Sequence, residues 1–314
     1  MLKRHPRETS LAVAILGIAA ILAVAAPGFF SLANQRDLVM ANVPVLIVAV
    51  GMTLVILTGE IDISVGSQFA IASVAAGIFA KWGLPMPLAG LSACLAGGIL
   101  GAANGALVAG ARIPSIVVTL AAMVALRDAL RWTTQGAWVQ DLPPGFQWLG
   151  TSQPNSQYIT MAVALLLWAS TAWAMRHLAA GRAVYATGSH ADAARLSGIH
   201  PRAVVFAVFT ATGALTGCAA FFNSVRFNQI PANAGIGLEL QVIAAVIVGG
   251  VAVTGGRGSL AGTLLGVILL GIIGPALTFL GINAYWERAI QGAIILTTVS
   301  LDARYARILL PQRA

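Results

Sequence analysis

Long apolar runs, separated by short polar segments, follow one another along almost the whole chain. Most are long enough for a helix of about 17 to 25 residues, the length that crosses a bilayer. Backbone N–H and C=O groups in lipid must be satisfied within a segment, and the runs lack the alternating polarity of barrel strands. The pattern therefore predicts an all-α, polytopic membrane helix bundle with about ten transmembrane helices. The ten runs are residues 10–27, 41–58, 62–80, 85–110, 114–132, 157–175, 203–222, 239–254, 259–280 and 287–302.

The composition agrees with this interpretation. Hydrophobic residues make up 58% of the 314 positions and charged residues only 9%, whereas a soluble domain carries about 25% charged residues. The net charge of +8 is not gathered in one tract or on one face, so it does not indicate nucleic-acid binding. The basic residues lie in short segments between the apolar runs, as they do in membrane proteins.

The basic residues also predict the orientation. With the N-terminus in the cytoplasm and the spans alternating, twelve fall on the inner side, five on the outer side and Arg127 within a span. Both termini are then cytoplasmic, and the first run stays as a span rather than a cleaved signal peptide. The inner residues are Lys3, Arg4, Arg7, Arg112, Arg176, Arg182, Arg195, Arg202, Arg257, Arg304, Arg307 and Arg313, and the outer ones are Arg36, Lys81, Arg131, Arg226 and Arg288.

Cofactor and metal chemistry find no support in the sequence. Cys94 and Cys218 lie inside apolar runs, and the four histidines are scattered, so neither a disulfide framework nor a metal site is expected. No catalytic constellation and no ATP-binding motif is present. We expect a non-catalytic chain without a cofactor.

The segment LTGEIDISVGS, residues 57–67, joins the second and third runs on the predicted inner side. Ionisable groups near membrane depth, here Glu60 and Asp62, are functional candidates. Asp62 or Ser64 would equally serve as a cap that accepts bonds from the free N–H groups of the next helix. Two interpretations therefore stand, a helix cap or a turn lining the permeation path near its inner gate, with Thr58, Glu60, Asp62 and Ser64 as the candidates.

A second segment, residues 186–204, contains a short amphipathic stretch, ADAARLSGI, between Gly188 and Pro201. A short helix on the cytoplasmic surface suits docking into a groove of a partner protein. The alternative is an interfacial helix that only orders the loop. The docking candidates are Gly188, Asp192, Ala193, Ala194, Arg195, Ser197 and Gly198.

Polar groups also occur inside the runs. Arg127 and Asp128 are adjacent in the fifth run and point in different directions on a helix, so at least one of them needs a partner on another helix or in a polar cavity. Asn104 lies in the fourth run. Arg127 and Asn104 are candidates for the substrate path, with bonding between helices as the alternative. Glycines spaced by four, such as Gly97 and Gly101, allow close helix packing, within the bundle or at a subunit interface.

Four segments together resemble the permease subunits of bacterial ABC importers for monosaccharides, the ribose, rhamnose and autoinducer-2 transport family. They are TGEIDISVGS (58–67), GSHADAARLSGIHPRAVVF (188–206), PANAGIGLELQVIAAVIVGG (231–250) and TGGRGSLAGTLLG (254–266). The likeness runs from about residue 40 to residue 302. Many family members carry a small residue where Glu60 stands, so the path here is expected to be tuned differently.

This resemblance implies one transmembrane permease domain over residues 1–314, in the bacterial inner membrane. It also implies a cytoplasmic ATP-binding subunit, a periplasmic sugar-binding protein and a second permease copy or paralogue as partners. The loop at about 176–202 would then couple to the ATPase, and the loop at about 133–156 would face the binding protein. A secondary transporter driven by an ion gradient is the main alternative, although only Asp128 among the acidic residues falls mid-span.

Overall fold

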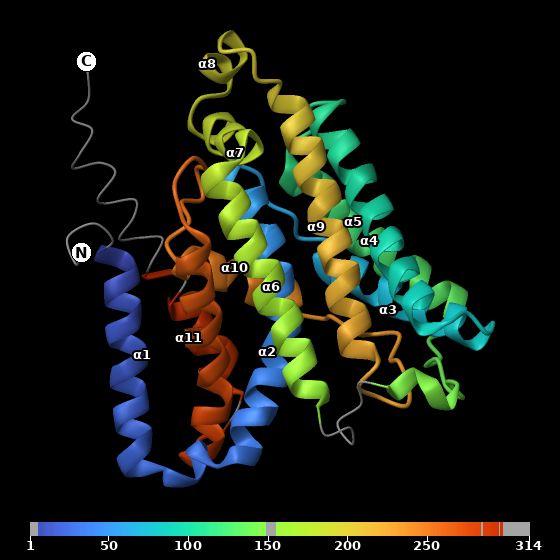
Figure 1. Cartoon of the computed structure of the whole chain (residues 1–314), viewed down its shortest axis with the longest axis vertical. Coiled ribbons are helices and arrows are strands. Elements are labelled where there is room, and N and C mark those ends of the chain that lie inside the picture. Colours follow the sequence, from blue (N-terminus) through green and yellow to red (C-terminus); the bar gives the residue numbers. More distant parts are fainter. Residues whose placement is uncertain (1–5, 149–154, 284, 295, 298–314) are drawn as a thin grey trace.

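A computed structural model describes residues 6–148, 155–283, 285–294 and 296–297, and these form a bundle of α-helices (Figure 1). Residues 286–294 are helical as well. The elements are α1 (Pro6–Ala25), η1 (Pro27–Phe30), α2 (Leu32–Leu57), α3 (Val65–Lys81), α4 (Met86–Ala109), α5 (Ser115–Thr134), η2 (Pro144–Gln147), α6 (Ser156–His177), α7 (Ala179–Ser189), α8 (Ala191–Leu196), α9 (Pro201–Ser224), α10 (Leu238–Val248) and α11 (Leu260–Phe279).

Six of the described helices are long and apolar enough to cross a membrane, namely α1, α2, α4, α6, α9 and α11. The predicted all-α membrane bundle is therefore confirmed, while the count of ten spans stays a prediction. Two predicted runs form shorter apolar helices, α3 with 17 residues and α10 with 11. Eleven residues rise about 16 Å, roughly half of the hydrocarbon core. The tenth run extends to 302, and its residues beyond 297 lie outside the described part.

The centre of the bundle is α2, which packs against α6, α9, α10 and α11. A polar bond between two helices lies in this apolar core: the hydroxyls of Thr53 on α2 and Thr263 on α11 are 2.8 Å apart. In contrast, α1 packs mainly along α11 at the edge of the molecule (Figure 1). The described core is thus centred on α2, which ends where the first motif segment begins.

Glycines set the closest helix packing. On α4, a Cβ at Gly97 or Gly101 would overlap the α9 carbonyl oxygens of Gly213 and Phe209. On α11, a Cβ at Gly266 would overlap the Ala245 carbonyl oxygen of α10. These glycine pairs therefore pack helices within the bundle, the first of the two interpretations drawn from their spacing.

The structure differs from the sequence interpretation in two places. The second helix begins at Leu32 rather than 41, because Ser31 accepts a bond from the Asn34 N–H (3.4 Å) and polar residues form its first turns. Arg36 therefore lies in a helix and not in a loop. In the segment 176–202, two helices, α7 and α8, form where one short helix was expected. AAGRAVYATGS contains Gly181 and Gly188, which disfavour a helix on propensity alone.

Candidate functional site

One end of the bundle gathers arginines from several elements. In Figure 1 this is the upper end, which carries α7 and α8. We call it the arginine-rich end. The positive-inside rule predicts that this end faces the cytoplasm. Of the six other predicted inner residues, Arg7 lies in the first turn of α1, and Lys3, Arg4, Arg304, Arg307 and Arg313 lie outside the described part. The arginines that it gathers are Arg112, Arg176, Arg182, Arg195, Arg202 and Arg257.

Three of the four motif segments meet at this end through their glycines. The Gly256 N–H donates to the carbonyl oxygen of Leu57, the last residue of α2, over 2.9 Å. Gly188, near the end of α7, lies against the same place: a Cβ there would overlap the Leu57 oxygen and lie 2.7 Å from the Gly256 nitrogen. A Cβ at Gly255 would lie 2.8 Å from the Gly59 nitrogen. We call these contacts the glycine junction, made by residues 57–59, 188–189 and 254–258.

Side chains of α7 complete the junction. The Tyr185 hydroxyl donates to the Gly258 carbonyl oxygen over 3.0 Å, and burial raises the pKa of this phenol. Since Tyr185 remains neutral at physiological pH, it keeps this donor. Gly255, Gly256 and Gly258 all have positive φ, of 83°, 73° and 149°. Glycine adopts such angles without strain, and the turn can therefore pack closely against α7.

The docking candidates divide between the junction and α8. Gly188 belongs to the junction, whereas Asp192 and Arg195 lie in the first and last turns of α8, where their charges favour the helix dipole. Gly198 ends the helix with φ of +82°. The side chain of Leu196 is 92% exposed at the tip of α8. The remaining candidates are Ala193, whose N–H donates to His190 Nδ1 (3.2 Å), the buried Ala194 and Ser197.

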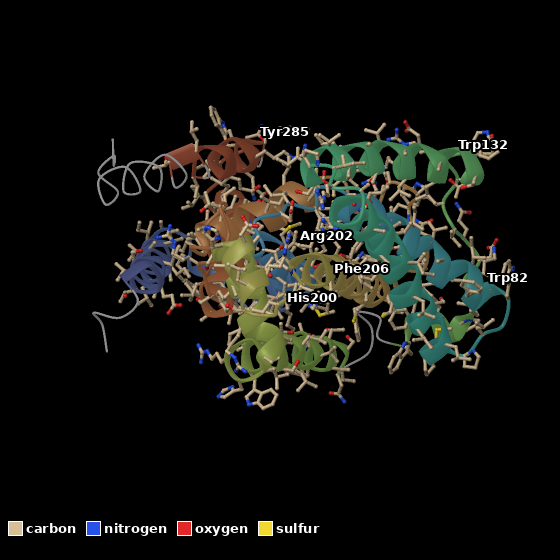
Figure 2. All side chains as sticks on the ribbon, turned by 90° about the horizontal axis from the view of Figure 1, so that it is seen from above. Trp82, Trp132, His200, Arg202, Phe206 and Tyr285 are labelled. Carbon is tan, nitrogen blue, oxygen red and sulfur yellow. The ribbon has the colours of Figure 1, made fainter. Side chains whose placement is uncertain are left out.

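A cavity of about 350 Å³ opens beside this loop. Thr58 and Glu60 line it, together with Arg112 of the α4–α5 connection and Arg202 of α9. Figure 2, which looks onto this end, shows His200, Arg202 and Phe206 near the middle of the molecule. We call it the inner cavity. It brings two of the four candidates from the 57–67 turn next to the docking loop.

The other two candidates of that turn lie in a buried network. Asp62 Oδ1 accepts bonds from the N–H and hydroxyl of Ser64 (2.9 and 2.6 Å), and Oδ2 accepts from Gln68 Nε2 (3.0 Å). Asn104 Nδ2, from α4, donates to the Ser64 hydroxyl over 2.8 Å. Asp62, Ser64 and Gln68 are fully buried. The Asp62 carboxylate therefore fixes the turn before α3 and ties it to α4.

Arg127 lies elsewhere, on α5. Its Nη1 donates to the Ala234 carbonyl oxygen over 2.8 Å, and its charge is attracted by Glu239 of α10. Its neighbour Asp128 is 66% exposed and pairs with Arg131 (3.5 Å) instead. Arg127 thus bonds between elements, while Asp128 and Arg131 make an exposed polar surface on α5.

The structure also adds residues that sequence reasoning missed. Ser115 Oγ accepts from the Ile61 N–H (3.2 Å), and the Thr119 hydroxyl donates to the Ile61 carbonyl oxygen (3.3 Å). Gln68 and Tyr185 belong to the networks above. Only Gln68 carried a signal, as a lone amide in an apolar run. Metal-ligating clusters of three or more side chains do not occur among the described residues.

The helices and their packing define a multi-pass membrane protein. A family model described as branched-chain amino acid transport system / permease component matches residues 34–299. The chain therefore belongs to this family of non-catalytic permease components. No solved structure matches the chain significantly.

Curated relatives refine the comparison. The chain is 38% identical over 312 residues to the probable ABC transporter permease protein YphD of Escherichia coli (strain K12), covering 99% of this chain and 92% of the relative. It is 33% identical over 306 residues to the autoinducer 2 import system permease protein LsrC of Enterobacter sp. (strain 638), covering 96% and 88%. It is 32% identical over 302 residues to the ribose import permease protein RbsC of E. coli (strain K12), covering 94% and 93%. The resemblance drawn from the four motifs is thus confirmed.

Proposed function

We propose that this chain is the permease subunit of an ATP-driven importer in the bacterial inner membrane, and that it forms the path for a monosaccharide or a sugar-like solute by alternating access. One observation carries the proposal: three motif segments, distant in sequence, converge in the glycine junction beside α8 and the inner cavity. The named relatives support the solute class, since two are import permeases for ribose and autoinducer 2.

The glycine junction supplies a route for mechanical coupling. Because Gly188 and Gly256 touch the end of α2 through backbone atoms, a displacement of α7 and α8 reaches α2 and the α10–α11 turn directly. Backbone contacts between small residues cannot absorb such a shift as long side chains would. Docking of the ATP-binding subunit on α8 would in this way move the helices that enclose the path.

The residues around the inner cavity are proposed as its inner gate. Thr58 and Glu60 line the cavity next to Arg112 and Arg202. A solute that leaves the path here would therefore contact side chains of both negative and positive charge. Asp62, Ser64 and Asn104 support this gate from behind by holding the turn in place.

A second permease is proposed to cover the polar surface of α5. Asp128 and Arg131 are exposed on a helix of membrane-spanning length, where contact with lipid would be costly. In Figure 2, α5 with Trp132 and the helix that follows Tyr285 lie along the same side of the molecule. A second copy or a paralogue on this side would enclose an aqueous path between the two chains, with Arg127 close to it.

The outer segment 133–156 is proposed to receive the periplasmic binding protein. Its described part is held to the bundle where Val139 pairs with Ile230 in an antiparallel bridge. Residues 149–154 of this segment lie outside the described part.

Co-purification tests the docking role. The proposed ATP-binding subunit is expected to co-purify with the wild-type chain, and Leu196→Glu and Arg195→Glu are expected to lose it while inserting normally into membranes. Leu178→Glu is the matched control, because Leu178 is an exposed leucine at the same end but outside α8. Normal association of both α8 variants would contradict docking through α8.

A further inference from the structure

A second cavity, of about 530 Å³, lies between α10 and the segment that follows α11. It is bounded by the start of α10, from Ile236 to Gln241, and by residues 283–291. α11 begins at the glycine junction and runs 20 residues to Phe279, so Asn283 lies near the far end of the bundle. The helix that follows returns along α11, since Glu287 lies against Gly274 and Ile294 packs beside Val248 at the end of α10. The cavity therefore reaches from the far end to the middle of the bundle, where α10 begins. We call this the outer cavity.

Its lining carries several polar side chains among apolar surface. Six side chains with hydrogen-bonding groups face it: Gln241, Asn283, Tyr285, Glu287, Arg288 and Gln291. Amide side chains donate and accept, a carboxylate accepts and a guanidinium donates. The one acidic and the one basic side chain balance in charge, so the lining suits an uncharged ligand with several hydroxyl groups.

The polar groups are held in position by the fold. Gln291 Nε2 donates to Glu287 Oε1 over 3.0 Å. Glu287 is seated against α11 at Gly274, where a Cβ would lie 2.5 Å from Glu287 Oε2. On the other wall, Gly237 caps α10 with φ of +86°, and its N–H donates to Glu239 Oε1 over 3.2 Å. The Glu287 and Gln291 side chains of one wall are therefore held in place, and the other wall begins at a defined helix cap.

We infer that the outer cavity is a solute-contact site that binds a neutral, polyhydroxylated molecule of monosaccharide size, with Gln241 and Gln291 as specificity-determining residues. This inference rests on the proposed importer function and assigns part of the solute selection to the permease itself. The volume falls within the range of about 300 to 1,000 Å³ that is typical of small-molecule sites.

Cysteine accessibility tests the site in the full chain in proteoliposomes. Gln241→Cys and Gln291→Cys are made singly with Cys94→Ser and Cys218→Ser, and a membrane-impermeant methanethiosulfonate is applied from the outer side. Both cysteines are expected to react, and D-ribose, D-galactose or L-rhamnose is expected to slow the reaction at least about threefold. The zwitterionic osmolyte glycine betaine, which has no hydroxyl groups, is expected not to slow it. Gln157→Cys at the start of α6, at the same end but outside the cavity, is the control and should react at a rate that no sugar changes.

Two results would overturn the inference: cysteines that do not react, because the cavity then lacks water, or cysteines that no sugar protects better than betaine. Uptake of the same sugars by the complex with its ATP-binding subunit and binding protein is measured in parallel. ATP-driven uptake without protection of the cysteines would refute the solute-contact site and support the importer function. Protection without ATP-driven uptake would support the site and refute the importer function. In a transporting complex, Gln241→Ala is expected to raise KM about three- to tenfold by the loss of one hydrogen bond, with kcat nearly unchanged.

Discussion

Gly188→Ala tests the glycine junction with the smallest possible change, one methyl group. The added Cβ would overlap the Leu57 carbonyl oxygen and lie 2.7 Å from the Gly256 nitrogen and 2.9 Å from the Leu57 carbonyl carbon. All three neighbours are backbone atoms, so no side chain can rotate away. The end of α2, α7 or the 254–258 turn must therefore shift.

The cost follows from two effects. Forcing extra volume into a close-packed place costs about 1 to 3 kcal/mol. Separating Gly256 from Leu57 also weakens the 2.9 Å hydrogen bond between them, which contributes about 1 kcal/mol. We expect a loss of about 2 to 4 kcal/mol in the free energy of unfolding, and a fall in the melting temperature of at least about 4 °C.

Thermal unfolding of the purified protein in detergent measures this loss, and uptake measures its effect on coupling. The matched control is Gly17→Ala in α1, a helical glycine with no atom within 4 Å of the added Cβ. The control should melt at or slightly above the wild-type temperature, since alanine favours helix. A Gly188→Ala protein that melts and transports like the wild type would refute the account of the junction.

Three other changes test neighbouring features. Asp62→Ala removes the acceptor of three buried hydrogen bonds and is expected to lower the free energy of unfolding by about 2 to 4 kcal/mol in a thermal or denaturant melt. Asp62→Asn should cost less. Equal stability of the wild type and both variants would argue against a structural role of Asp62. Tyr185→Phe loses the bond to Gly258 and is expected to cost about 1 kcal/mol with the ATP-binding subunit still bound, so loss of that subunit in a pull-down would contradict it. Gly274→Ala displaces Glu287 and is expected to raise KM for solute several-fold, and an unchanged KM in uptake kinetics would count against the outer cavity.

The sequence was sufficient to predict a membrane protein and to locate the segments by which its family is recognised. Apolar runs of spanning length identified the bundle, and the grouping of arginines separated one end from the other. The four motif segments identified the family. Within them, Thr58 and Glu60 line the inner cavity beside the docking loop, and their role in the permeation path stays a prediction.

Other features depend on tertiary contacts that a single sequence does not display. Helix length in α3 and α10 is set by the turns before them, where Asp62 binds Ser64 and Gly237 adopts a positive φ. The meeting of Gly188 with Gly256 joins residues 68 positions apart. The outer cavity could not be predicted from the sequence, because its polar side chains are spread over two separate segments of an apolar region.

Reconstituted transport tests the central claim most directly. The chain is placed in proteoliposomes with its ATP-binding subunit and binding protein, and uptake of labelled D-ribose, D-galactose and L-rhamnose is followed with and without ATP. The account predicts uptake of at least one sugar only when all components and ATP are present, and its loss in Leu196→Glu. Sugar accumulation by the chain alone, driven by a proton or sodium gradient, would contradict it.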